Sequence, residues 1–155
     1  MTLLDVENLW VKFPTRQGVF DAVRGISFSL RQERLGIVGE SGSGKSMTGR
    51  AILRLIRKPG IVEADRIALE GRDLMGLSER DMRSVRGQRI SMVMQDPKFS
   101  LNPVMTIGAQ IMEAYRIHHD VSKIVARKRA VEVLDRVGIP QARSRLDDFP
   151  HQFSG

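Results

Sequence analysis

The amino-acid sequence predicts an α/β fold, because strand patterns and helix patterns occupy different stretches of the chain. In the first stretch, apolar and polar residues alternate as they do in antiparallel strands, and the candidate strands are residues 9–13, 19–23 and 26–30. The apolar run 35–38 leads through a glycine-rich loop into a helical pattern. After residue 97 only helical patterns follow. The sequence therefore joins a β-containing first part to a helical second part.

The middle of the chain carries the signals of a strand–loop–helix core. Short apolar runs predict buried strands at residues 35–38 and 90–94. A helix is expected over residues 45–56, and Pro59-Gly60 ends it. Residues 66–70 alternate in polarity and predict one more strand. These elements place the glycine-rich loop between a buried strand and a helix N-terminus.

Capping residues predict where further helices begin. Ser78 is followed by acidic residues and predicts a short helix after it. Thr106 predicts a helix that runs to about Tyr115, and Ser122 predicts another with apolar residues along one face. The sequence Gly138-Ile139-Pro140 would end that last helix.

The glycine-rich loop matches G-x-x-x-x-G-K-[ST], a pattern whose residues surround a polyphosphate. Its residues are Gly39, Glu40, Ser41, Gly42, Ser43, Gly44, Lys45 and Ser46. Glycines let the backbone N–H groups approach the phosphates, and the helix dipole adds positive potential. Lys45 would contact the β- and γ-phosphates, and the Ser46 hydroxyl would ligate Mg²⁺. We therefore predict a nucleotide-binding core with a β subdomain in residues 1–96 and a helical subdomain in residues 97–155.

The composition excludes several classes of protein. The chain has 155 residues and no cysteine, so disulfides and cysteine-based zinc sites are excluded. Its net charge of +7 comes from dispersed basic residues, and 5% aromatic residues give little support for stacking on nucleic-acid bases. No apolar stretch approaches the roughly 18 residues of a membrane-spanning helix. We expect neither direct nucleic-acid binding nor a transmembrane segment of its own.

The loop and the motifs that follow it resemble those of the ATP-binding subunit of an ABC transporter, a P-loop NTPase. The tail Phe149-Pro150-His151-Gln152-Phe153-Ser154-Gly155 is similar to the start of that family's signature loop, L-S-G-G-Q, with Phe153 in the leucine place. Together with this tail, Gln95-Asp96-Pro97 and Ser100-Leu101-Asn102-Pro103 are similar to motifs of the dipeptide/oligopeptide importer branch, which also includes nickel importers. The resemblance implies the N-terminal part of an ABC ATPase, with a partial helical subdomain.

The resemblance also implies roles for single residues. Phe13 is similar to the aromatic residue that stacks on adenine, with Trp10 as the alternative and Val23 beside the ring. Lys45 and Gln95 would take part in catalysis, and Gln95 would join Ser46 as a Mg²⁺ ligand. The implied ATP-binding residues are Phe13, Val23, Gly39 to Ser46, Met47, Ser154 and Gly155. Ser154 and Gly155 would cap the nucleotide held by a second subunit in a head-to-tail dimer.

The function implied is that of an importer subunit that couples ATP binding and hydrolysis to the uptake of di- or oligopeptides through a membrane permease. Such a subunit lies peripherally at the cytoplasmic face of the inner membrane. A nickel importer ATPase and a soluble ABC-type ATPase acting on nucleic acid are the alternatives. A GTPase or small-molecule kinase is less favoured, since the guanine-binding pattern Asn-Lys-x-Asp is absent. A fragment that only binds nucleotide is compatible with the first function.

Part of the family's pattern is not found in these residues. The pattern requires an apolar strand ending in Asp, followed by a Glu that polarises water and a switch histidine, and the family places them beyond the signature. We therefore expect negligible ATP hydrolysis by this chain alone. We also expect the predicted strands 35–38 and 90–94 to lack sheet neighbours, which favours association, strand exchange or partial disorder after Pro97.

Overall fold

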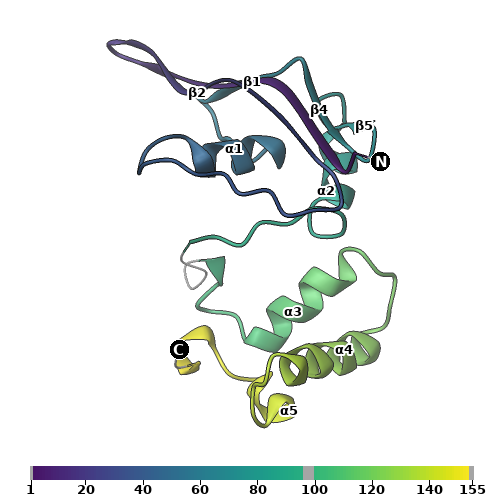
Figure 1. The fold of residues 1–155 in the computed structure, drawn as a ribbon. Helices are drawn as coiled ribbons and strands as arrows, with labels where there is room; N and C mark the ends of the chain where they lie inside the picture. The colour runs from purple at the N-terminus through teal and green to yellow at the C-terminus, as the bar shows by residue number, and fades with distance from the viewer. Residues whose placement is uncertain (1, 96–99, 154–155) are drawn as a thin grey trace. The chain divides into compact units, whose positions relative to one another are not determined.

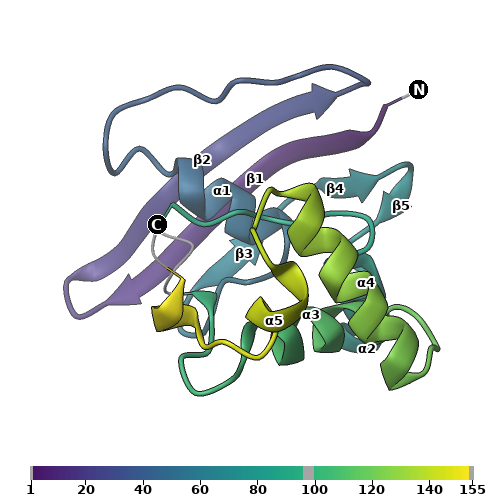
Figure 2. The same ribbon diagram turned by 90° about the horizontal axis from the view of Figure 1, so that it is seen from below.

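The computed structural model describes residues 2–95 and 100–153. The chain divides into two compact units, Met1–Ser91 and Met92–Gly155. Figures 1 and 2 label the elements of both. The functional division at residues 96 and 97 stays a prediction.

The first unit is built on an antiparallel sheet. Its strands are β1 Leu4–Thr15, β2 Gly18–Leu30, β3 Ile61–Glu63, β4 Arg66–Leu69 and β5 Arg72–Asp73. The strand order is β2-β1-β4-β5, and β3 pairs with another part of β1. The strands predicted at residues 9–13, 19–23, 26–30 and 66–70 are thus confirmed, although they merge into longer elements. The very short strands β3 and β5 were not predicted, because two or three residues give no measurable alternation.

The long β1–β2 hairpin is interrupted by register shifts. Val6 pairs with Phe28 but Leu9 pairs with Ile26, so β1 carries one extra residue there. Because an extra residue reverses which side chains face the core, Val6 and Leu9 can both be buried although they are three positions apart. The hairpin therefore keeps a continuous apolar face in spite of its irregular ladder.

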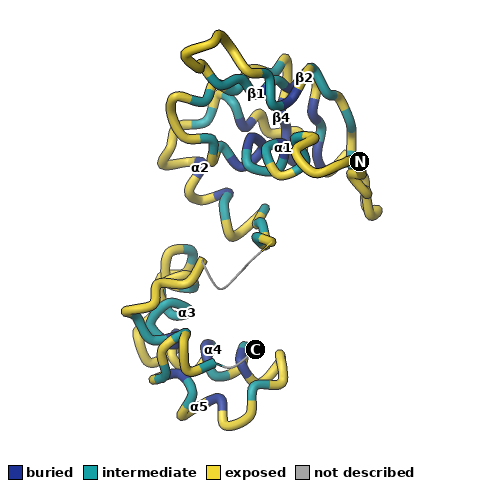
Figure 3. The backbone as a smooth tube through the Cα atoms, turned by 90° about the vertical axis from the view of Figure 1, so that its left-hand side faces the viewer, coloured by how far each residue is buried: buried dark blue, intermediate teal, exposed yellow. Residues whose placement is uncertain are grey.

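Two helices cover this apolar face (Figure 1). Helix α1, Lys45–Ile52, contributes Ala51 and Ile52 to the core, and helix α2, Glu79–Val85, contributes Met82 and Val85. In Figure 3, dark blue marks the buried residues along the backbone of the first unit, on its strands and on α1. Burial of an isoleucine, methionine or valine side chain stabilises a fold by about 1.5–3 kcal/mol.

Helix α1 ends at Ile52, earlier than the predicted Ile56. Arg54 adopts the left-handed conformation with φ 53°, and the Leu55 N–H donates to the Arg50 carbonyl at 2.8 Å. Helices often end at a residue in this left-handed conformation, and that residue is usually glycine. Because arginine occupies the position here, the sequence gave no signal that the helix ends. Helix α2 begins as predicted, with the Asp81 N–H donating to the Ser78 hydroxyl at 3.1 Å.

The buried strands predicted at residues 35–38 and 90–94 are wrong for this structure. Residues 33–40 form no strand, and the segment runs as plain chain between β2 and α1 (Figure 1). Val38 is 93% exposed and Val93 is 85% exposed. A strand of a buried parallel sheet needs hydrogen-bonded neighbours. Among the described residues, only a single bridge from Arg86 to Ile90 pairs with either segment.

The second unit is helical. It contains α3 Ile107–Arg116, α4 Lys123–Arg136, α5 Ala142–Arg145 and the 3₁₀-helix η2 Pro150–Gln152. Thr106 and Ser122 cap α3 and α4 as predicted, each accepting a backbone N–H bond with its hydroxyl. The core joins these helices through Ile107, Ala130, Leu134, Ala142 and Leu146. No helix in the described part of the chain is long and apolar enough to cross a membrane.

Candidate nucleotide site

The last glycine of the loop, Gly44, lies against strand β2. Gly44 is the residue before α1 and has φ 92°. A Cβ atom at this position would collide with the Ala22 carbonyl oxygen and would lie 3.2 Å from the Val23 side chain. Glycine is therefore required at Gly44 by both backbone conformation and space. Gly42 also has a positive φ, 83°, but open space surrounds it.

Lys45 folds back over the loop. Its Nζ donates to the Gly39 carbonyl at 2.7 Å, to the Glu40 carbonyl at 2.6 Å and to the Ser43 hydroxyl at 3.2 Å. These acceptors are neutral, whereas a phosphate would accept a stronger, charge-assisted bond. The ammonium is thus already placed at the loop where a phosphate would bind.

Thr48 anchors the first turn of α1 to the loop. It is buried, its N–H donates to the Gly44 carbonyl at 2.9 Å, and its hydroxyl donates to the same oxygen at 3.1 Å. Sequence reasoning missed this residue, although its position four residues after Gly44 is the spacing of such a bond in a helix. Ser46 is exposed in the same turn, and Met47 is half-buried and packs against the core.

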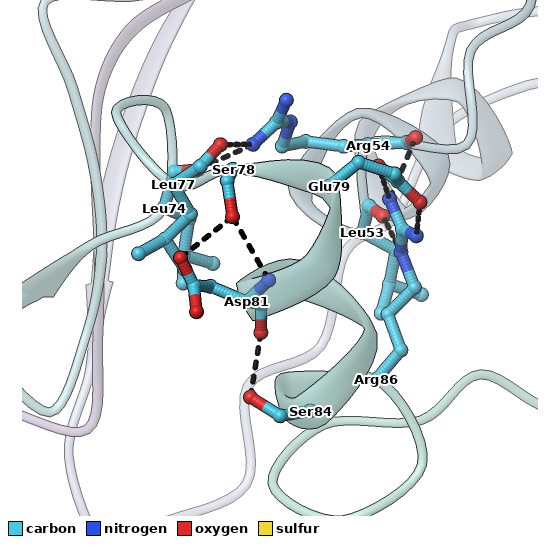
Figure 4. Close-up of polar contacts among 9 residues, drawn as sticks. All are labelled: Leu53, Arg54, Leu74, Leu77, Ser78, Glu79, Asp81, Ser84 and Arg86. Carbon is cyan, nitrogen blue, oxygen red and sulfur yellow. Dashed lines mark hydrogen bonds and ion pairs between the residues drawn. The ribbon is translucent and has the colours of Figure 1, made fainter. Parts of the chain in front are cut away.

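The opposite end of α1 is held by a polar cluster (Figure 4). The Arg86 guanidinium donates to the Leu53 carbonyl at 2.7 Å and to the Arg54 carbonyl at 3.2 Å. It also forms an ion pair with Glu79 at 2.6 Å. The hydrogen bond from Arg86 lowers the pKa of the Glu79 carboxyl below its ordinary value. Arg54 in turn donates to the Leu77 carbonyl at 2.6 Å, so the cluster joins α1 to the chain leading into α2.

A cavity of about 550 Å³ lies beside the loop. Gly42, Ser43, Lys45 and Thr48 line it from the loop and α1, and Ile37 and Val38 line it from the preceding segment. The remaining lining comes from β2, with Phe20, Asp21, Ala22, Val23, Arg24 and Ile26. This volume falls within the roughly 300–1,000 Å³ of small-molecule sites. The cavity combines an apolar wall with a cation, as a nucleotide requires.

The predicted base-contacting residues have different surroundings. Val23 is buried and lines the cavity. Phe13 is half-buried and packs against the core and Gly60, where a Cβ atom would lie 2.8 Å from the Phe13 ring. Trp10 donates its indole N–H to Asn8 at 2.8 Å and lies against Gly25. Among the described residues that line the cavity, neither Phe13 nor Trp10 appears.

The remaining predicted site residues lie elsewhere in the chain. Gln95 is exposed and belongs to the second unit. Ser154 and Gly155 lie outside the described residues. Within residues 2–95 and 100–153, no three histidine or carboxylate side chains gather as a metal-binding cluster. The roles of Ser46 and Gln95 as Mg²⁺ ligands therefore stay predictions.

Comparisons with known proteins identify the family. A family model described as ABC transporter matches residues 23–155. The chain is 50% identical over 155 residues to the oligopeptide transport ATP-binding protein OppD of Bacillus subtilis (strain 168), covering 99% of this chain and 43% of that protein. It is 48% identical over 156 residues to the dipeptide transport ATP-binding protein DppD of Escherichia coli (strain K12), covering 100% of this chain and 48% of that protein. The chain thus spans about half the length of these relatives.

Solved structures show the same fold. The dimeric structure of MJ0796, a bacterial ABC transporter cassette, matches with a TM-score of 0.81 and 22% identity, over 98% of this chain and 63% of that chain. A post-hydrolysis form of MJ0796 bound to ADP and Pi matches with a TM-score of 0.81 and 21% identity, over 97% of this chain and 63% of that one. The predicted α/β fold of an ABC ATPase N-terminal part is confirmed.

Proposed function

The chain belongs to the ABC transporter family, and we propose that it is the N-terminal nucleotide-binding part of an ATPase subunit that powers peptide import. The loop geometry carries this proposal, because Gly44 fits against β2 and Lys45 lies over the loop. The similar OppD and DppD proteins are oligopeptide and dipeptide transport ATP-binding proteins, which favours peptide over nickel as the solute. These relatives do not favour the alternative of an ATPase acting on nucleic acid.

The residues of this chain would bind and orient ATP. The loop N–H groups and Lys45 would hold the phosphates, and the dipole of α1 would add positive potential at its N-terminus. Ser46 fits a Mg²⁺ role, because its hydroxyl is a hard oxygen ligand on the exposed first turn of the helix. Bound Mg²⁺ would neutralise charge on the β- and γ-phosphates. Gln95 is proposed as its second protein ligand.

The whole subunit would work with partners. We assign it a second ATP-binding subunit, arranged head to tail, and integral-membrane permease subunits at the cytoplasmic face of the inner membrane. The dimeric cassette among the similar structures supports the first assignment. Ser154 and Gly155 would then act on the nucleotide of the second subunit. The 155 residues by themselves would bind ATP but hydrolyse it negligibly, because their sequence holds no apolar strand that ends in the Asp-Glu pair.

Thermal unfolding with increasing Mg·ATP tests nucleotide binding. A ligand that binds only the folded state stabilises it by about 2.7 kcal/mol at a hundredfold excess over Kd. We expect the melting temperature to rise with Mg·ATP, and the rise to disappear in Lys45→Ala. An unchanged melting temperature in the unsubstituted chain would overturn the proposed function.

A further inference from the structure

The chain that leads from α5 to Phe153 is fixed to the first turn of α3. The Ile107 N–H donates to the Asp148 carbonyl at 2.8 Å, and the Gly108 N–H donates to the Leu146 carbonyl at 2.8 Å. The first N–H groups of a helix have no partner within the helix, so these bonds satisfy two of them. A Cβ atom at Gly108 would lie 2.6 Å from the Leu146 carbonyl oxygen, so the two segments are in close contact. This part of the chain is therefore a fixed base for the segment that follows it.

Arg145, the last residue of α5, reaches from this base to Phe153. Its guanidinium lies over the Phe153 ring, with 4.4 Å between the guanidinium carbon and the ring centroid. The same guanidinium donates to the Asp148 carboxylate at 2.7 Å and lies 3.5 Å from the Gln152 carbonyl oxygen. The Arg145 side chain is only 30% exposed, and a cation–π contact is stronger when the cation loses part of its hydration. One side chain thus contacts the base, the helix η2 and the ring.

Two kinds of contact act on Phe153. Its N–H donates to the Pro150 carbonyl at 3.2 Å, and the Gln152 side-chain oxygen accepts the Phe149 N–H at 2.8 Å. These bonds set the shape of the η2 turn. The Phe153 ring is half-buried against the core of the helical unit and also contacts the Arg145 guanidinium. The backbone bonds therefore shape the turn, whereas the core and Arg145 position the ring.

An aromatic residue at Phe153 differs from the signature pattern L-S-G-G-Q, which has leucine in this place. A leucine could pack against the same core, but it offers no π face to a cation. The planar guanidinium of arginine stacks on such a face better than the compact ammonium of lysine does. The structure thus pairs the aromatic ring of Phe153 with the type of side chain that can use it.

We propose that Arg145 is a positioning residue, which binds the Phe153 ring and thereby fixes the place where the signature segment begins. It would act through Phe153 on the residues that follow, and not by touching the nucleotide. This inference rests on the proposed function, in which Ser154 and Gly155 act on the nucleotide of the second subunit. Arg145 belongs to the unit Met92–Gly155, so its loss should leave the phosphate loop of the first unit unchanged.

NMR of the 155-residue chain tests the contact itself. In Arg145→Ala, the backbone N–H order parameter of Phe153 should fall from about 0.85, typical of a rigid backbone, to below about 0.6. The ring current of Phe153 should shift the side-chain protons of Arg145 upfield, and Phe153→Leu should remove this shift. Arg143→Ala is the matched control, because Arg143 is exposed on the same helix, and it should change neither signal. An unchanged order parameter in Arg145→Ala would overturn the proposal.

ATP hydrolysis by the whole subunit tests the consequence. Arg145→Ala should lower kcat by about 2- to 30-fold, the effect of losing a cation–π contact. The KM for ATP should stay the same, because the residues that bind ATP in the ground state are unaltered. Arg145→Lys keeps the charge but not the planar group, so it should restore part of the lost kcat.

A double-mutant cycle shows whether the two side chains act together. The kcat losses of Arg145→Ala and Phe153→Leu should be less than additive in the double variant, because both substitutions remove the same contact. Additive losses would overturn the proposal, as would a normal kcat in Arg145→Ala. If the unsubstituted subunit hydrolysed no ATP, the proposed function itself would fail.

Discussion

The apolar residues of β1 and those of residues 35–38 have opposite surroundings. Val6, Leu9 and Val11 in β1 are completely buried, whereas Leu35, Ile37 and Val38 are all about half exposed or more. β1 pairs with β2, β3 and β4, while the described residues offer residues 35–38 no strand partner. Apolar composition alone therefore does not bury a segment. Burial requires that the backbone groups of the segment also find hydrogen-bond partners.

The substitution pair Leu9→Ala and Val38→Ala tests this contrast most strongly. Leu9 is fully buried in the core of the first unit, and removing a buried leucine side chain costs about 2–5 kcal/mol. Val38 is 93% exposed, so its truncation should change the free energy of unfolding by less than about 0.5 kcal/mol. Urea unfolding of both variants measures the difference. An equal destabilisation would mean that residues 35–38 are buried in solution, for example by association.

A second pair, Gly44→Ala and Gly42→Ala, tests whether the contact of Gly44 with β2 fixes the glycine-rich loop. Residues 35–38, which precede the loop, pair with no described strand. At Gly42 there is open space, so alanine should cost only about 1–2 kcal/mol for its left-handed conformation. At Gly44 the same conformational cost is joined by a collision with the Ala22 carbonyl. We expect Gly44→Ala to destabilise the fold more than Gly42→Ala and to abolish Mg·ATP binding. Similar unfolding curves for the two variants would show that the loop is not held against β2.

The smallest expected effect concerns the Arg86 cluster at the far end of α1. Because the hydrogen bond from Arg86 lowers the pKa of Glu79, the unfolded chain takes up this proton first as pH falls. The contribution to stability is therefore complete above the ordinary pKa of 4.5 and is lost as pH falls through the lower, folded value. Arg86→Ala should return the Glu79 pKa toward 4.5, measured by NMR titration.

Arg83→Ala is the control for this titration, because Arg83 lies on α2 and is exposed. Its charge is a smaller cause of the lowered Glu79 pKa than the hydrogen bond from Arg86. We expect it to move the Glu79 pKa less than Arg86→Ala does. An equal shift in both variants would mean that general positive charge, and not the Arg86 contact, sets this pKa.

Features determined by neighbouring residues were predictable from the sequence. The glycine-rich loop, the cap residues Ser78, Thr106 and Ser122, and the alternating strands all depend on local contacts, and the structure contains them. The end of α1 was predicted too late, because its stop is an arginine in a conformation usually adopted by glycine. Thr48 was missed because its hydroxyl bond serves the loop backbone and belongs to no functional motif.

By itself, the sequence determined the family, the α/β fold class and the phosphate loop, since these follow from local spacing of residue types. Only the tertiary structure decided that β1 keeps both Val6 and Leu9 in the core, because one extra residue between them changes the side of every residue beyond it. It also decided that residues 35–38 stay exposed. Pairing and register depend on contacts between distant parts of the chain, and those contacts leave no local pattern in the sequence.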